Sequence, residues 1–256
     1  MSIKVGLLGF GRTGSLVAKE IVNDPDLELV WVCRNNIPNN QKYASHSLGY
    51  DQSFAEFITP SMLTDDFFKD KPIDLIIDFS SGESSLYYNL FSERQIKIVT
   101  AISKYTVKQM ERLQKACLDT AILASPNITL GINWLLIASK VLKKIIPFAD
   151  VEIVEEHFRA KNETSGTALK IAEHLNIEPN EHINSIRVGG IVGKHEVIFG
   201  LPHQTLRLTH ESISRSAFGT GAIFAGKWLL NKKNGLYKME HLVHEKFIKH
   251  ITTLEI

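Results

Sequence analysis

Short apolar runs alternate with helical patterns along the first half of the chain. The runs cover residues 3–10, 27–33, 74–80, 96–102 and 121–125, and each has the length of a buried strand. Residues 13–24 carry apolar side chains at helical spacing (Leu16, Val17 and Ile21), and residues 107–119 also show a helical pattern. Strands that alternate with helices predict a doubly wound α/β domain with a parallel sheet, over residues 1–126.

The pattern changes after this point. Residues 131–146 predict one long amphipathic helix, and β-rich runs follow at residues 150–158, 185–193, 195–201 and 205–212. A helical segment at residues 166–175 interrupts these runs. We therefore expect a second, α+β domain over residues 127–212, with a mostly open antiparallel or mixed sheet. The helix at residues 218–232, the last that the pattern predicts, is free to pack on the first domain, which residues 213–256 would complete.

Composition narrows the class of protein. Hydrophobic residues make up 44% and charged residues 22%, which is ordinary for a globular protein. The formal net charge of +1 gives no electrostatic reason to expect a nucleic acid or an anionic membrane as partner. Residues 1–14 lack signal-peptide features, and no apolar run approaches the roughly 20 residues that cross a bilayer. Cys33 and Cys117 are far apart and fit a reducing cytoplasm, so we expect a cytoplasmic protein without a metal site.

Three glycines follow the first predicted strand in the order G-x-G-x-x-G. They are Gly9, Gly11 and Gly14, with Phe10, Arg12 and Thr13 between them. The motif lies between a strand and an amphipathic helix, where backbone N–H groups and the helix dipole bind pyrophosphate. These six residues are therefore candidates for dinucleotide binding in a Rossmann-type domain. The alternative is a tight strand-to-helix turn without a ligand.

The end of the second predicted strand bears on which dinucleotide is bound. Domains that prefer NAD usually place an acidic residue about 20 residues after the glycines, but the sequence has none between Glu28 and Asp51. Arg34 stands near that place instead, followed by Asn35 and Asn36. Because an arginine can pair with a 2′-phosphate, the sequence favours NADPH over NADH. The alternative is a solvated surface arginine.

The stretch EEHFRAKNETSGTA, residues 155–168, combines three kinds of polar group. His157 lies near the end of a predicted strand, Lys161 follows four residues later, and Ser165-Gly166-Thr167 begins a predicted helix. A histidine can donate a proton near neutral pH, a lysine adds a second positive charge, and a helix N-terminus binds a carboxylate. This combination suits the reduction of a ring that carries carboxylates. Alternatively, His157 is structural and Ser165 only an N-cap; the other nine histidines are interpreted as structural or exposed.

Seven segments carry a resemblance that covers nearly the whole chain. They are GFGRTG, LIIDFSSGESSL, SPNITLGIN, EEHFRAKNETSGTA, SIRVGGIVGKHEVIFG, LRLTHESISRSAFGTGA and GLYKMEHL. Together they resemble the 4-hydroxy-tetrahydrodipicolinate (dihydrodipicolinate) reductase family of lysine and diaminopimelate biosynthesis, whose substrate motif usually reads H-H-x-x-K-x-D-A-P-S-G-T-A. By this resemblance His157 is the proton donor and Lys161 matches the motif's lysine. Ser165, Gly166 and Thr167 match its cradle for a substrate carboxylate.

The resemblance also implies a cofactor, a substrate and an assembly. It implies hydride transfer from NAD(P)H to a cyclic dicarboxylate held between the two domains, commonly within a homotetramer, with the second domain serving oligomerisation. It places Phe79 and Ser80 near the adenosine half of the cofactor. The residues that it places at the nicotinamide end are Ala101, Ile102, Ser103, Ser125, Pro126, Asn127 and Ile128.

The sequence departs from the family pattern at four places. Phe158 stands where the motif has its second histidine, a substrate contact, and NET replaces the D-A-P element with one residue fewer. Ala101-Ile102-Ser103-Lys104 replaces the usual G-T-T-G, and the glycine loop is one residue shorter than the common form. The altered loop favours one alternative, a dehydrogenase of the same architecture that acts on another amino or imino acid. A second alternative, a non-catalytic nucleotide-sensing protein, would explain Phe158 but gives no reason for His157 and Lys161.

Overall fold

The computed structural model describes residues 2–37 and 41–253, which form two compact units. The first comprises the described residues up to Ile128 together with Phe218–Leu242. The second comprises Thr129–Ala217 together with the described residues from Val243 onward. Each unit has its own sheet and its own hydrophobic core.

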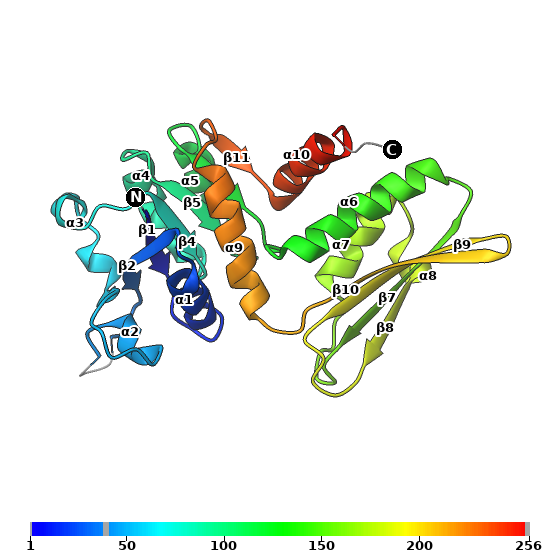
Figure 1. The fold of residues 1–256 in the computed structure, drawn as a ribbon, viewed down its shortest axis with the longest axis horizontal. Coiled ribbons are helices and arrows are strands. Elements are labelled where there is room, and N and C mark those ends of the chain that lie inside the picture. The colour runs from blue at the N-terminus through cyan, green and yellow to red at the C-terminus, as the bar shows by residue number, and fades with distance from the viewer. Residues whose placement is uncertain (1, 38–40, 254–256) are drawn as a thin grey trace. The chain divides into compact units, whose positions relative to one another are not determined.

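The sheet of the first unit is parallel at every described strand pair (Figure 1), with the order β11-β6-β5-β4-β1-β2-β3. The order reverses between β1 and β4, which is the topological switch point of a doubly wound sheet. The strands are β1 (Ile3–Leu8), β2 (Leu27–Cys33), β3 (Glu56–Ile58), β4 (Leu75–Asp78), β5 (Lys97–Thr100), β6 (Ala121–Ala124) and β11 (Gly235–Tyr237).

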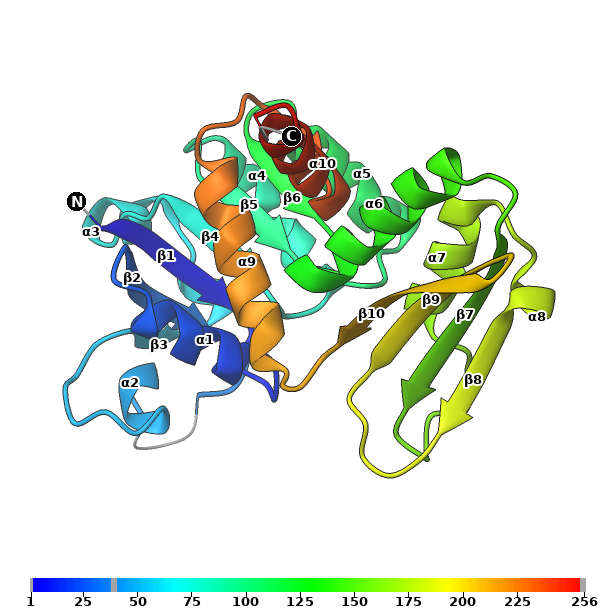
Figure 2. The same ribbon diagram turned by 45° about the vertical axis from the view of Figure 1, so that its right-hand side comes forward.

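Helices cover both faces of this sheet (Figure 2). On one face lie α1 (Gly14–Asn23) and α9 (Ser216–Leu229), and Lys227 of α9 forms an ion pair with Asp24 at the end of α1, at 2.8 Å. On the other face lie α3 (Asp65–Asp70), α4 (Tyr88–Ser92) and α5 (Val107–Ala116). Three short helices complete the connections: α2 (Ala44–Ser47), η1 (Pro60–Met62) and η2 (Gly82–Tyr87).

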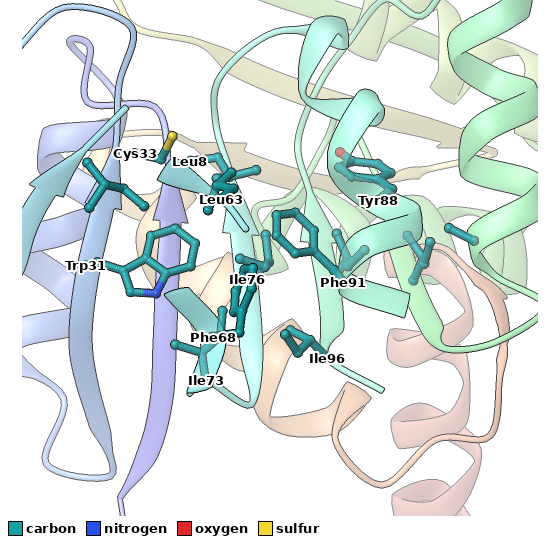
Figure 3. Close-up of a cluster of buried hydrophobic side chains, with 14 of the residues drawn as sticks. Leu8, Trp31, Cys33, Leu63, Phe68, Ile73, Ile76, Tyr88, Phe91 and Ile96 are labelled. Atoms are coloured by element: carbon teal, nitrogen blue, oxygen red, sulfur yellow. The ribbon is translucent and has the colours of Figure 1, made fainter. Parts of the chain in front are cut away.

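The cluster of buried side chains in Figure 3 holds the central strands against these helices. Successive side chains of a strand point to opposite faces, so Leu8, Trp31 and Ile76 turn to the same face from β1, β2 and β4. There they pack with Phe68 of α3 and Phe91 of α4. This packing fixes the ends of the three strands, and with them the loops that follow.

The second unit has a mixed sheet with the order β10-β9-β7-β8. Its strands are β7 (Asp150–His157), β8 (Ile183–Arg187), β9 (Lys194–Leu201) and β10 (Gln204–Glu211). β7 runs parallel to β8 and antiparallel to β9, which is antiparallel to β10. α6 (Leu130–Ile145) and α7 (Gly166–Leu175) pack on one face of this sheet and bury Ile153, Val197 and Phe199. The remaining helices are α8 (Pro179–His182) and, near the end of the chain, α10 (Met239–Ile251).

The doubly wound parallel sheet and the second α+β unit with a mixed sheet confirm the predicted fold class. Two details of the prediction are wrong. The run at residues 185–193 is a strand only as far as Arg187, because Gly189 adopts φ of +54° and turns the chain. The helix at residues 218–232 is not the last one, since α10 follows it. In the part of the chain that the structure describes, no helix is both long and apolar enough to cross a membrane.

Candidate active site

The carboxyl ends of β1, β2 and β4 meet at one edge of the first unit's sheet, where a cavity of about 620 Å³ opens. Open α/β sheets bind ligands beyond the carboxyl ends of the strands at the point where the strand order reverses, and this cavity lies there. Among the predicted cofactor residues, its lining includes Gly9, Phe10, Gly11, Arg34, Phe79 and Ser80.

The three glycines of the first loop have different surroundings. Gly9 adopts φ of +91°, and a Cβ atom on it would lie 2.7 Å from the carbonyl oxygen of Phe79. A Cβ atom on Gly14 would lie 2.3 Å from the carbonyl oxygen of Gly9, so α1 packs directly on the loop. At Gly11, by contrast, no atom lies within 4 Å of the Cβ position. The loop thus has the tight turn, the open approach and the close helix contact that suit a dinucleotide's pyrophosphate.

Arg34 follows β2 directly and lines the same cavity. Its Cζ atom lies 5.9 Å from the ring centre of Phe10 and 5.2 Å from that of Phe57. These two rings contact each other edge to face, with their centres 5.0 Å apart. Among the described residues, no carboxylate forms an ion pair with Arg34. The guanidinium group therefore packs on two aromatic rings, and its positive charge can pair with a ligand anion.

A buried carboxylate shapes the loop after β4. Asp78 is fully buried and accepts hydrogen bonds from the Ser80 N–H (2.9 Å) and hydroxyl (2.6 Å), the Ser84 hydroxyl (2.5 Å) and the Tyr88 hydroxyl (2.8 Å). Burial raises the pKa of Asp78, although these bonds oppose the shift. Tyr88 in turn contacts the Tyr105 hydroxyl at 3.1 Å. The loops after β4 and β5 are therefore tied to one polar cluster.

The other predicted cofactor residues lie along the same sheet edge, outside the cavity lining. Ala101 donates its N–H to the Asp78 carbonyl oxygen, and Ser125 donates its N–H to the Thr100 carbonyl oxygen, each at 3.0 Å. Ile128 is fully buried. The residues predicted for the nicotinamide end follow β5 and β6; they are Ala101, Ile102, Ser103, Ser125, Pro126, Asn127 and Ile128. Three others lie where the glycine loop enters α1: Arg12, the N-cap Thr13 and Gly14, the first residue of the helix. Their contact with a cofactor stays a prediction.

In the second unit, β7 brings Glu155 and His157 to the same face of the sheet, because alternate residues of a strand share a face. Nδ1 of His157 lies 2.5 Å from Oε2 of Glu155. His157 is 8% exposed and Glu155 is fully buried. A Cβ atom on Gly193 would lie 3.0 Å from Nε2 of His157, so a glycine at that position leaves room beside Nε2.

Glu155 is the centre of a hydrogen-bonded cluster. It accepts from Nη1 (2.8 Å) and Nη2 (2.5 Å) of Arg187, from the Ser185 hydroxyl at 2.6 Å and from the Ser165 N–H at 3.2 Å. Burial alone raises the pKa of a carboxyl group, but the bonds from Arg187, Ser185, His157 and Ser165 outweigh it and hold the pKa of Glu155 at about 2. Because an ionised carboxylate only accepts hydrogen bonds, the proton between this pair belongs to Nδ1 of His157.

Arg187 also fixes the loop between His157 and α7. Its Nε atom donates to the Lys161 carbonyl oxygen, and its Nη2 atom donates to the Glu163 carbonyl oxygen, each at 2.8 Å. The ammonium group of Lys161 forms no ion pair within the described residues. The loop backbone is thus held in place, and the charge of Lys161 remains for a ligand.

Ser165 is the N-cap of α7, and its polar groups are engaged inside the protein. Its hydroxyl accepts from the Thr167 N–H at 3.2 Å and lies 2.8 Å from Nε2 of His195. Its own N–H donates to Glu155. Gly166 is exposed, with no atom within 4 Å of its Cβ position. Gly166 and the half-buried Thr167 therefore form the accessible part of the predicted carboxylate cradle.

His195, on β9, lies against both His157 and Ser165. Its ring meets the His157 ring edge to face, with the centres 5.2 Å apart. Burial, followed by the charge of His157, lowers the pKa of His195 to about 3, so this ring is neutral at neutral pH. The sequence predicted His195 only as structural or exposed and indicated no role for Arg187 or Glu155.

The structure brings His157, the Lys161 loop and the start of α7 to one end of the second unit's sheet. Phe158, directly after β7, is 42% exposed. The roles of these residues toward a substrate stay predictions.

Two family models match the chain. One is described as "Dihydrodipicolinate reductase, N-terminus" and matches residues 3–128, and the other as "Dihydrodipicolinate reductase, C-terminus" and matches residues 128–243. A 4-hydroxy-tetrahydrodipicolinate reductase from Caldanaerobacter subterraneus is 33% identical over 258 residues, covering 91% of this chain and 94% of the relative. One from Methanocaldococcus jannaschii is 28% identical, covering 92% of this chain and 95% of the relative.

Solved structures share the fold at lower identity. A dipicolinate-bound dihydrodipicolinate reductase from Paenisporosarcina superposes with a TM-score of 0.76 at 21% identity, covering 94% of this chain and 99% of that one. A DAP dehydrogenase from C. glutamicum, in complex with DAP, gives a TM-score of 0.59 at 12% identity, covering 93% of each chain. These likenesses support the architecture alone, so the dehydrogenase does not favour the alternative reaction.

Proposed function

This chain belongs to the dihydrodipicolinate reductase family, and from that premise we propose that it reduces 4-hydroxy-tetrahydrodipicolinate to tetrahydrodipicolinate with a hydride from a nicotinamide cofactor. The conversion replaces a hydroxyl group by hydrogen. The hydride enters the ring, and the departing oxygen leaves as water once it has gained a proton. The reaction therefore needs a protein group that supplies a proton near the ring.

His157 is the group that fits this role. Its Nδ1 atom is bonded to Glu155 at 2.5 Å, which leaves Nε2 as the nitrogen that exchanges a proton with a substrate. A carboxylate on Nδ1 fixes the ring orientation and stabilises the imidazolium ion, as in other histidine–carboxylate pairs. The His157–Glu155 contact is the single observation that most strongly supports the proposal.

Lys161 and the start of α7 suit the carboxylates of the substrate. The backbone of Lys161 is anchored through Arg187, and its ammonium group is left to pair with an anion. The N-terminus of α7 adds the helix dipole and the Gly166 and Thr167 groups. A small cyclic dicarboxylate therefore meets opposite charge at both places.

The glycine loop and the 620 Å³ cavity suit the cofactor NAD(P)H, which supplies the hydride when it is bound. We place its adenosine half against Gly9, Gly11, Phe79 and Ser80. Arg34 would pair with a 2′-phosphate, so NADPH is the preferred form. We also place its nicotinamide end along the loops after β5 and β6.

Turnover by the pure protein tests the function. Freshly prepared 4-hydroxy-tetrahydrodipicolinate is mixed with NADPH, and cofactor oxidation is followed by absorbance while the product is identified by mass spectrometry. We expect tetrahydrodipicolinate with one NADPH consumed for each molecule formed. Oxidation with diaminopimelate or another amino acid, and none with the ring substrate, would instead support the alternative dehydrogenase. Size-exclusion chromatography with light scattering tests the homotetramer that the family resemblance implies.

A further inference from the structure

Glu155 receives hydrogen bonds from two neighbouring segments as well as from its own strand. His157 lies on β7 itself, Ser185 and Arg187 lie on β8, and Ser165 caps α7. All of these groups lie around a side chain that is fully buried. The segments that carry the proposed proton donor and the proposed carboxylate cradle therefore meet at one carboxylate.

A buried ion pair is a costly way to stabilise a sheet. Removing two charges from water costs several kcal/mol for each ion, and apolar residues of similar volume often stabilise such a position equally well. The same face of β7 is apolar at Val151 and Ile153, nearer the middle of the unit. The Glu155–Arg187 pair stands only at the end of this face, next to His157. Its place indicates that it serves the site rather than the core.

The pair acts on the site in two directions. Toward His157, the ionised carboxylate accepts a hydrogen bond from Nδ1–H and so determines that Nε2 faces the reaction. Toward the loop, Arg187 donates to the carbonyl oxygens of Lys161 and Glu163 while it holds Glu155 with both ends of its guanidinium fork. Only an arginine has enough donors in a planar array to make all of these bonds.

We infer that Glu155 and Arg187 are positioning residues for the reaction: Glu155 fixes the protonated nitrogen and the orientation of His157, and Arg187 fixes the backbone from which Lys161 reaches the substrate. This inference rests on the proposed reductase function and deepens it. Neither residue needs to touch the substrate. Glu155 acts through the His157 ring and Arg187 through the loop backbone, so the two effects can be separated by kinetics.

Glu155→Gln tests the first part. The substitution keeps the shape but removes the charge that stabilises the imidazolium ion. We expect kcat to fall about 10–100-fold, the usual cost of losing such a supporting partner, with the Kd of NADPH unchanged. The matched control is Glu152→Gln on the same strand, whose carboxylate contacts His182 at 3.0 Å and is 44% exposed. The control should leave kcat within about twofold of the wild type.

Arg187→Lys tests the second part. A lysine keeps the positive charge beside Glu155 but cannot bond the carboxylate and both loop carbonyl groups together. We expect the KM of the ring substrate to rise about tenfold or more, with a smaller change in kcat. Arg207→Lys is the control, because Arg207 pairs with Glu196 at 2.5 Å and is 58% exposed. An Arg187→Lys enzyme with the wild-type KM would overturn the assignment of Arg187.

The tautomer of His157 supplies a readout that does not depend on activity or on the stability of a variant. Nitrogen-15 NMR of the full-length wild-type protein with NADPH should show a proton on Nδ1 in the neutral ring. A neutral ring protonated on Nε2 instead, or a Glu155→Gln enzyme with kcat within threefold of the wild type, would overturn the assignment of Glu155. A wild-type protein that does not turn over the ring substrate would refute the reductase function, while the NMR result still decides whether Glu155 orients His157.

Discussion

Nδ1 of His157 lies 2.5 Å from Oε2 of Glu155, which occupies the same face of β7 two residues earlier. Alternate side chains of a strand lie on the same face, so the histidine at the last residue of β7 contacts a carboxylate that is buried two residues earlier. The carboxylate is closed off from water, and the histidine is 8% exposed. The strand therefore supplies both a proton donor and the group that orients it.

His157→Gln should lower kcat by about 10²–10⁴-fold, the typical contribution of a general acid, because glutamine cannot supply an acidic proton. Lys161→Ala should lower kcat as well, because it removes the ammonium group while the Lys161 carbonyl oxygen that Arg187 holds stays in place. Steady-state kinetics and calorimetric titration with NADPH check both variants, and the Kd of NADPH should stay at the wild-type value. His182→Gln is the control, because the His182 ring contacts Glu152 at 3.0 Å and lies outside the cluster around Glu155. Losses under about threefold in both variants would remove the two assigned roles.

Arg34→Ala should abolish a preference for NADPH. The guanidinium over Phe10 and Phe57 would make one charge-assisted pair with the 2′-phosphate, which contributes about 1.5–3 kcal/mol and so about tenfold or more in affinity. NADH lacks the phosphate, so its binding should change little. Calorimetry with both cofactors on both proteins measures the effect. Equal affinities of the wild-type protein for NADPH and NADH would refute the role of Arg34.

Two glycine substitutions should separate folding from cofactor binding. Gly14→Ala places a methyl group 2.3 Å from the Gly9 carbonyl oxygen, so we expect a loss of about 1–3 kcal/mol in the free energy of unfolding. Gly11→Ala meets no protein atom within 4 Å, so stability should hold while the methyl group crowds the pyrophosphate and weakens NADPH binding. Urea unfolding and NADPH titration of both variants are the measurements. A Gly11→Ala protein that binds NADPH as tightly as the wild type would place the pyrophosphate elsewhere.

The sequence predicted those elements in which a local pattern of apolar residues marks the buried side chains. β2 and α7 have the bounds that their apolar runs and flanking residues predict, because both bury a continuous strip of side chains. β3 and β11 are three residues long and lie at the two edges of the sheet, so they carry too few apolar residues to stand out. α10 mixes apolar residues with charged residues and histidines, and the pattern predicted no helix after residue 232.

The site was predictable only within single segments. His157, Lys161 and Ser165 are close in sequence, and Glu155 could have been added from the two-residue period of a strand. Arg187 and His195 could not, because their places depend on strand register. β8 pairs Arg187 with His157, and β9 pairs His195 with Glu155, across 30 and 40 residues of chain. No local pattern in one sequence specifies such a register.

His195 should make the free energy of unfolding fall as the pH is lowered. The folded-state pKa is about 3, below the ordinary 6.5, so between these values the unfolded chain binds a proton that the folded protein does not. The contribution of the neutral His195 ring to the free energy of unfolding is complete above pH 6.5 and is lost as the pH falls toward 3. Urea unfolding at pH 7, 6 and 5 should show that the free energy of unfolding of His195→Gln falls by about 1–2 kcal/mol less than that of the wild type between pH 7 and 5. The comparison avoids the pH range in which Glu155 titrates. Equal losses in the two proteins would show that His195 is not held neutral.

Pyridine-2,6-dicarboxylate should bind beside Gly166 and Thr167 at the start of α7. The helix end offers N–H donors and a favourable dipole, and the Thr167 hydroxyl adds a donor. Thr167→Val keeps the shape and removes that hydroxyl, so binding should weaken by about 1 kcal/mol, roughly fivefold in Kd. Phe158, 42% exposed beside His157, replaces a histidine of the family motif, and Phe158→His should tighten binding if the shorter NET loop lets that ring reach the ligand. Titration into NADPH-loaded protein measures all three affinities, with Thr205→Val on β10 as the control for a threonine-to-valine change. Absence of binding at millimolar ligand, or an unchanged Kd in Thr167→Val, would refute the carboxylate cradle and leave the substrate to be sought among other amino or imino acids.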